Sequence, residues 1–258
     1  MELLIWLLHQ GISIILRSFS MLIPAADIKN KMIVSDYLQV FSNILCIFAF
    51  RKYLYCFSPK NILSKKNIRI CLYAILAGIG ICLAHRLIFL LFPQIGMTML
   101  PQMDYVRNIQ KYYYSPAIFT YAILWAPISE EILSRGIIFT VAQKKHGNVY
   151  AITISAFLFA LAHYNLPQFF SALCLGLLIG YFAVLTDNVY IGVIIHVANN
   201  MYASIREMIL GDKIWEMSQK DFFINAIMGI FILLFSIFMI NYETHNLAKR
   251  QKIDFRES

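Results

Sequence analysis

The chain has 258 residues, of which 60% are hydrophobic and only 14% charged, and its formal net charge is +8. A soluble domain carries about 25% charged residues, so this composition excludes an ordinary soluble protein and indicates an integral membrane protein. The positive charge does not indicate a nucleic-acid partner, because Lys and Arg fall in short loops and the C-terminal tail rather than on a basic face interleaved with aromatic residues. We expect these residues to set the topology and to contact anionic lipids of the bilayer.

Eight apolar segments have lengths near the roughly 20 residues that cross a bilayer as a helix. They cover residues 3–23, 32–50, 70–92, 116–142, 149–163, 168–185, 189–205 and 222–242. The first segment has no basic start and contains polar residues, so we expect a retained anchor rather than a cleaved signal peptide. The pattern predicts an all-α, polytopic membrane helix bundle of about eight transmembrane helices, with residues 1–258 forming a single membrane domain.

The connections between these segments predict the topology. Basic residues gather in residues 51–69, in 142–148 and in the tail, which share one face if the segments alternate sides. The positive-inside rule then places this face and both termini in the cytoplasm. Short turns at Asn165–Pro167 and Thr186–Asn188 predict that the segments they join are antiparallel neighbours.

The stretch Ala126–Gly136, APISEEILSRG, places three charged residues inside the fourth apolar segment. A charge at the bilayer centre costs about 2.5 to 3.5 kcal/mol, so these side chains must face protein or water. Glu131 and Arg135 are four residues apart, so on a helix they share a face and can pair. Glu130 points about 100° away from Glu131, which leaves its carboxylate available for chemistry.

Two other segments carry polar pairs with the same helical spacing. His196 and Asn200 are one turn apart and can point toward one place, whereas Asn199 is expected to turn aside. Phe159 and His163 repeat this spacing on another segment.

The depth of these groups provides a second criterion. With a rise of 1.5 Å per residue counted from the 142–148 side, Glu130 lies roughly 18 Å deep, His163 about 21 Å, His196 about 11 Å and Asn200 about 17 Å. Polar groups from three helices therefore reach similar levels, which predicts a polar catalytic cavity in the bundle.

The chemistry of this set suits hydrolysis of a peptide bond. Glu130 with His163 can take a proton from water, and His196 with Asn200 can offer N–H donors to the oxyanion that forms. Glu130, His163 and His196 would also form a zinc site with an open position for water, although no HExxH motif is present. A third interpretation is a polar cluster that only holds helices together.

Three stretches resemble the signature motifs of the CPBP family, the CAAX protease and bacteriocin-processing intramembrane peptidases, also called the Abi family. The stretches are APISEEILSRGII, SAFLFALAHY and VYIGVIIHVANN, and the family patterns are EExxxR, FxxxH and HxxxN. The resemblance covers roughly residues 126–201, inside a core at about 116–205.

The resemblance implies a metal-independent glutamate endopeptidase without a cofactor, with zinc as the alternative described above. The catalytic residues would be Glu130, His163, His196 and Asn200, and the supporting residues would be Glu131, Arg135 and Phe159. The family's substrates include prenylated CaaX tails and, in bacteria, peptides of bacteriocin maturation or self-immunity. A bacterial plasma membrane and a peptide or membrane-protein substrate are therefore expected.

Two other function classes compete with this interpretation. The first is a non-catalytic membrane regulator or immunity protein that binds a sensor kinase or a toxin receptor; the complete motif set favours the enzyme over it. The second is a proton-coupled carrier, but the sequence lacks the paired broken helices typical of carriers.

Some polar and aromatic residues outside the three motifs have structural explanations. We expect His9, Arg17, His85 and Arg86 to snorkel or to contact the cavity rather than to catalyse. Tyr112–Tyr114 are expected to form an aromatic belt at the membrane interface.

Overall fold

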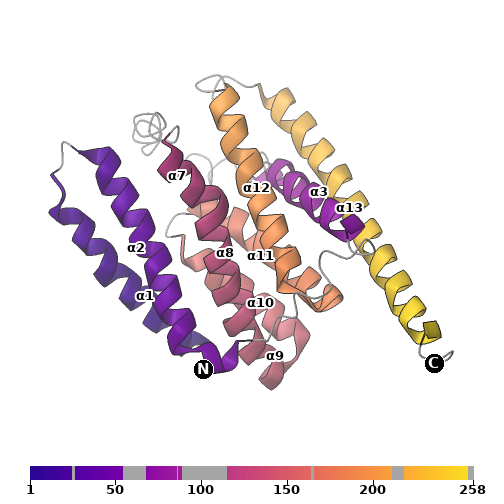
Figure 1. Cartoon of the computed structure of the whole chain (residues 1–258). Coiled ribbons are helices and arrows are strands. Elements are labelled where there is room, and N and C mark those ends of the chain that lie inside the picture. The colour runs from indigo at the N-terminus through magenta and orange to yellow at the C-terminus, as the bar shows by residue number, and fades with distance from the viewer. Residues whose placement is uncertain are drawn as a thin grey trace.

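The computed structural model describes residues 1–24, 27–54, 68–85, 87–88, 115–163, 166–210 and 218–254. Every regular element among these residues is a helix, and the helices form one bundle (Figure 1). The predicted all-α membrane bundle is thus confirmed. Arg86 and the tyrosines Tyr112–Tyr114 lie outside the described residues.

The described helices overlap each of the eight predicted segments. In chain order they are α1 (Glu2–Ser18), η1 (Phe19–Leu22), α2 (Ile28–Ala49), η2 (Arg51–Tyr53), α3 (Ile68–Ala84), α7 (Pro116–Thr120), η4 (Tyr121–Trp125), α8 (Ala126–Glu131), η5 (Ile132–Phe139), α9 (Thr140–His146), α10 (Asn148–Leu161), α11 (Leu166–Thr186), α12 (Val189–Leu210) and α13 (Gln219–Asp254). The turn predicted at Thr186–Asn188 joins α11 to α12, and Asp187 there has a positive φ of 49°.

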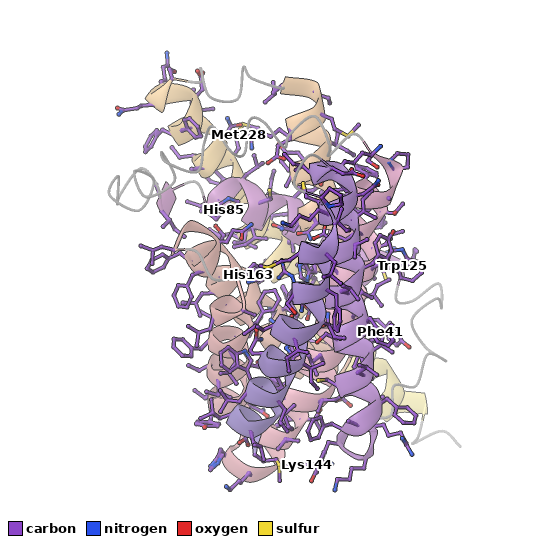
Figure 2. The ribbon with its side chains drawn as sticks, turned by 90° about the vertical axis from the view of Figure 1, so that its left-hand side faces the viewer. Phe41, His85, Trp125, Lys144, His163 and Met228 are labelled. Carbon is purple, nitrogen blue, oxygen red and sulfur yellow. The ribbon has the colours of Figure 1, made fainter. Side chains whose placement is uncertain are left out.

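Four stretches of the described residues are long and apolar enough to cross a membrane. They are Glu2–Leu22, Ile28–Ala49, Gln168–Thr186 and Gln219–Leu247. Large apolar side chains on the outside of the bundle, such as Phe41, Trp125 and Met228, are about half exposed (Figure 2). An outer surface of this kind suits lipid rather than water.

One long helical rod carries the EExxxR motif. It runs from α7 to α9 without a break, and η4 and η5 within it have π-helical geometry (Figure 1). The Ala126 N–H bonds to the carbonyl of Tyr121, five residues back. In this register the next carbonyl, that of Ala122, would be paired with Pro127, which has no N–H to donate. Pro127 therefore leaves the Ala122 carbonyl without a backbone partner.

The other helices pack around this rod. The α1–α2 hairpin lies on one side of it, and α12, α3 and α13 lie on the other, with α10 and α11 behind (Figure 1). Both ends of the chain lie at the same end of the bundle as α9. The elements that carry the three motifs are thus central and contact helices from both sides.

The approach of α3 to α12 requires glycine at position 78. A Cβ on Gly78 would lie only 2.3 Å from the carbonyl oxygen of Ile195 and 2.9 Å from the backbone nitrogen of Asn199. Small residues at such positions let membrane helices come close together. Since Ile195 and Asn199 flank His196, this contact also helps to set the place of His196.

We expect Gly78→Ala to destabilise the protein by about 1 to 3 kcal/mol, because overpacking pushes α3 away from α12. Thermal unfolding in detergent would measure the loss. Gly11→Ala is the matched control in α1, since a Cβ there has no atom within 4 Å. Equal melting temperatures for the two variants would contradict the close packing of α3 on α12.

Candidate active site

A cavity of about 730 Å³ opens between the α1–α2 hairpin and the central helices. All four residues predicted to be catalytic line it: Glu130, His163, His196 and Asn200. They come from α8, from the turn that follows α10 and from α12. The structure therefore brings to one cavity the polar groups that depth alone had suggested were neighbours.

Glu131 is the buried centre of the polar cluster. Its Oε1 accepts a bond of 3.2 Å from Arg135 Nη1, so the pair predicted from the helical spacing is confirmed. The same oxygen lies 2.9 Å from His196 Nδ1. Glu131 and Arg135 are both 0% exposed, and Arg135 Nη2 also donates to the carbonyl of Gly176 at 3.0 Å. Glu131 therefore links the rod to α12 and contributes more than the single ion pair predicted from sequence.

The bond to Glu131 fixes the orientation of the His196 ring. A carboxylate can only accept hydrogen bonds, so Nδ1 of His196 must carry the proton that is donated to Glu131. The opposite ring nitrogen, Nε2, then faces Glu130, whose Oε2 lies 4.0 Å away. The Glu130 side chain keeps 25% of its surface accessible, whereas that of Glu131 is fully buried. Of the two adjacent carboxylates, Glu130 is the one that a guest in the cavity can touch.

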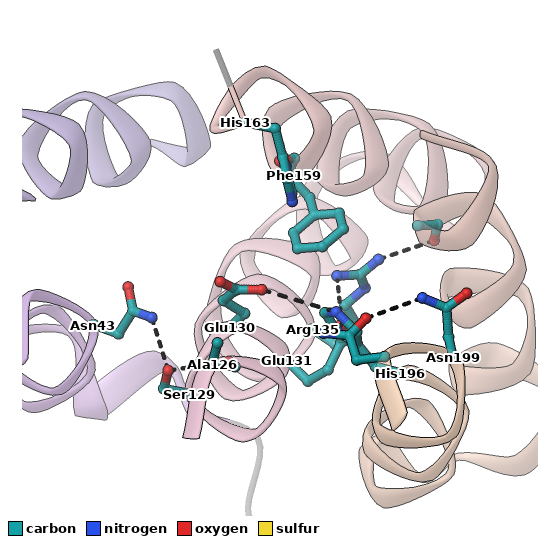
Figure 3. Close-up of polar contacts among 12 residues, drawn as sticks. Asn43, Ala126, Ser129, Glu130, Glu131, Arg135, Phe159, His163, His196 and Asn199 are labelled. Atoms are coloured by element: carbon teal, nitrogen blue, oxygen red, sulfur yellow. Dashed lines mark hydrogen bonds and ion pairs between the residues drawn. The ribbon is translucent and has the colours of Figure 1, made fainter. Parts of the chain in front are cut away.

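The Phe159 ring separates the two histidines. Its centroid is 5.1 Å from the ring of His163 and 5.6 Å from that of His196, and both contacts are edge-to-face. The Arg135 guanidinium carbon lies 5.0 Å from the same ring centroid (Figure 3). The His163 Nδ1 lies 3.1 Å from the carbonyl of Phe159. The aromatic residue of the FxxxH motif therefore holds both imidazoles and the arginine in place by packing.

Asn200 contacts the unusual turn of the rod. Its Nδ2 donates a hydrogen bond of 2.9 Å to the carbonyl of Ala122, the group that Pro127 leaves without a backbone donor. Its Oδ1 accepts from Asn199 Nδ2 at 3.0 Å. The Asn200 amide nitrogen carries two hydrogens. One bonds to the Ala122 carbonyl, and the other can be donated to a second acceptor.

The prediction that Asn199 turns aside is wrong. Asn199 and Asn200 both line the cavity and bond to each other. The cavity spans a broad arc of α12, so two consecutive residues about 100° apart on the helix both reach it.

We expect Asn200→Ala to lower the rate of peptide hydrolysis about 100- to 1,000-fold, as the loss of one oxyanion donor does in other hydrolases. It should also destabilise the fold by about 1 to 3 kcal/mol, because the Ala122 carbonyl loses its donor. Asn199→Ala is the control, since it removes only the bond to Asn200. A rate per folded molecule that is the same in both variants would contradict the oxyanion role.

The sequence interpretation missed three polar residues that the N-terminal hairpin adds to the wall of the cavity. They are Gln10 from α1 and Gln39 and Asn43 from α2. His9 contacts the cavity, which is one of the two places expected for it, and Arg17 and His85 line it as well. The available signal was the helical spacing of Gln39 and Asn43, two amide residues one turn apart in an apolar segment.

Within the described ranges, no group of three or more His, Cys, Asp or Glu side chains is arranged to hold a metal ion. A chelator distinguishes the metal-independent reaction from the zinc alternative.

Comparison with family models identifies the segment that carries the cluster. Residues 113–202 match the family described as type II CAAX prenyl endopeptidase Rce1-like. Comparisons with curated proteins and with solved structures gave no match. The matched segment extends from just before α7 into α12 and includes all three motifs. The chain is therefore an integral membrane protein whose residues 113–202 match the Rce1-like family of type II CAAX prenyl endopeptidases.

Proposed function

We propose that the protein is a metal-independent intramembrane endopeptidase that uses Glu130 to activate water. The observation that carries this proposal is the accessible Glu130 carboxylate, 4.0 Å from a His196 ring that Glu131 holds in one orientation, inside a cavity of about 730 Å³. A preorganised acid–imidazole arrangement of this kind is suited to proton transfer and to binding an oxyanion.

In the proposed reaction Glu130, assisted by His163, takes a proton from a water molecule as the water oxygen attacks the substrate carbonyl. The tetrahedral oxyanion accepts hydrogen bonds from His196 Nε2 and from Asn200 Nδ2. Since Nδ1 of His196 already carries a proton, Nε2 can donate only when the ring is an imidazolium. Glu130 then passes its proton to the leaving nitrogen as the carbon–nitrogen bond breaks.

The proposed substrate is a peptide tail that enters from the membrane, and a prenylated CaaX tail is the first class to test. The matched family, whose description names a prenyl endopeptidase, supports this choice. Peptides of bacteriocin maturation or self-immunity are the second class. We further propose a bacterial plasma membrane with both termini cytoplasmic; Lys144 and Lys145 at the same end of the bundle as both chain ends support this orientation (Figure 1).

The test uses the full-length protein in liposomes and an internally quenched peptide that ends in a farnesylated CaaX sequence. We expect cleavage by the wild type, no loss of activity with 1,10-phenanthroline, and loss of activity in His163→Ala with an unchanged melting temperature. Inhibition by the chelator that zinc reverses would favour the zinc alternative. A folded wild type that cleaves neither this peptide nor bacteriocin precursor peptides would favour a non-catalytic regulator or immunity protein.

A further inference from the structure

A chain of buried hydrogen bonds joins the N-terminal hairpin to the helix that carries Glu130. The His9 ring Nε2 lies 2.6 Å from Asn43 Oδ1. Asn43 Nδ2 donates to Ser129 Oγ at 2.8 Å (Figure 3). The Ser129 hydroxyl in turn donates to the carbonyl of Ala126 at 3.2 Å. His9, Asn43 and Ser129 are 6%, 1% and 5% exposed, so all three side chains are largely buried.

The direction of every bond in this chain follows from the chemistry of Asn43. Its Oδ1 can only accept, so Nε2 of His9 must carry the proton, and Nδ1 of a neutral ring is then an acceptor. Gln10 Nε2 lies 3.1 Å from that Nδ1 and can donate to it. Donors and acceptors therefore alternate without conflict from Gln10 to Ala126 when His9 is neutral. A buried network in which each donor of the chain from Gln10 to Ala126 meets an acceptor favours one arrangement of the helices that it joins.

The network ends at a short helix that lies between two segments of π-helical geometry. Helix α8 has only six residues and lies between the π-helical segments η4 and η5, and Pro127 removes one backbone donor within it. The regular bonds of an α-helix therefore do not by themselves fix this turn. Ser129 directly precedes Glu130, so the bond from Asn43 holds the turn from which the Glu130 side chain projects.

We propose that Asn43 is a positioning residue for Glu130, and that the α1–α2 hairpin is thereby part of the active site although it lies outside the family match at residues 113–202. This inference rests on the proposed role of Glu130. Asn43 acts through Ser129 and not on the substrate. A displacement of about 1 Å at a catalytic group can cost on the order of 100-fold in rate, so a single buried bond can matter this much.

The first test compares Asn43→Leu and Ser129→Ala with the wild type in the farnesylated-peptide assay. We expect kcat per folded molecule to fall about 10- to 100-fold in each variant while KM stays nearly unchanged. The double variant should be no slower than the slower single variant, because both changes remove the same bond. If Asn43 only anchored the hairpin, the yield of folded protein would fall but kcat per folded molecule would not, and the inference would be overturned.

Ser42→Ala is the matched control for Asn43→Leu. Ser42 is on the same helix and fully buried, and its hydroxyl has no hydrogen-bond partner among the described residues. It also does not line the cavity. We expect this variant to keep the wild-type kcat. A similar loss of kcat in Ser42→Ala and Asn43→Leu would show a general packing effect of α2 and would contradict the positioning role.

A second measurement does not depend on the identity of the substrate. Dicyclohexylcarbodiimide reacts with carboxyl groups in membranes, and mass spectrometry of the peptide that contains Glu130 measures its rate of modification. We expect this rate to change several-fold in Asn43→Leu and Ser129→Ala and to stay constant in Ser42→Ala; equal rates in all proteins would overturn the inference. Full activity of Glu130→Gln would instead contradict the proposed function. If the wild type cleaves none of the peptides, the labelling rates alone decide whether Asn43 positions Glu130.

Discussion

Glu130→Gln should reduce peptide hydrolysis by about 100- to 10,000-fold, the range that a general base contributes. Glutamine has nearly the same shape as glutamate but cannot take a proton from water. Glu130 has no hydrogen-bond partner among the described side chains, and its nearest ion-pair partner is His196 at 4.0 Å, so its loss leaves no buried charge unpaired. The variant should therefore insert and fold like the wild type.

Two measurements on the same liposome preparation check this result: the initial rate of peptide cleavage and the melting temperature. The expected outcome is a large loss of rate with an unchanged melting temperature. A variant that keeps the wild-type rate would rule out Glu130 as the base, and the regulator interpretation would then account better for the structure.

Glu131→Gln, one residue later in the chain, should act mainly on stability. It should destabilise the fold by about 3 to 5 kcal/mol. Glu131 is 0% exposed and accepts bonds from both Arg135 and His196 through one oxygen. The neutral variant leaves the fully buried Arg135 guanidinium without its counter-ion. Removing one partner of a buried ion pair lowers stability because the remaining charge stays desolvated and unpaired.

Glu130→Gln is the matched control for this prediction, since it makes the same chemical change one residue earlier. The combined variant Glu131→Gln with Arg135→Gln should recover part of the lost stability, because no buried charge is then unpaired. Thermal unfolding in detergent measures all three variants. Equal melting temperatures for Glu130→Gln and Glu131→Gln would contradict the assignment of Glu131 as the structural centre of the cluster.

Local relations within one helix were predictable. The pairing of Glu131 with Arg135 depends only on the helical repeat, which brings residues four apart onto one face. The segments themselves were predictable for a similar reason, because a bilayer demands long apolar helices whatever their partners are. The family assignment also rests on short local motifs, and the match to residues 113–202 confirms it.

Contacts between helices were less predictable, and the carboxylate that holds His196 is an example. Sequence spacing gave Glu131 a single partner, whereas the crossing of α12 over α8 adds His196 at 2.9 Å. The bond from Asn200 to Ala122 depends on the widened turn before Pro127, and no motif describes that turn. Such contacts depend on the crossing angle and the distance between two helices. The periodicity of side chains along one helix does not encode these two quantities.

The sequence by itself determined a helical membrane protein, its family and the residues that could carry the chemistry, because these follow from composition, helical period and motif spacing. Tertiary structure alone gave the buried Glu131 its second partner, His196 in α12, and it brought Asn43 in α2 to Ser129 in α8. The physical reason is that burial and hydrogen bonding between distant residues depend on how helices pack, and a packing arrangement is a property of the whole bundle.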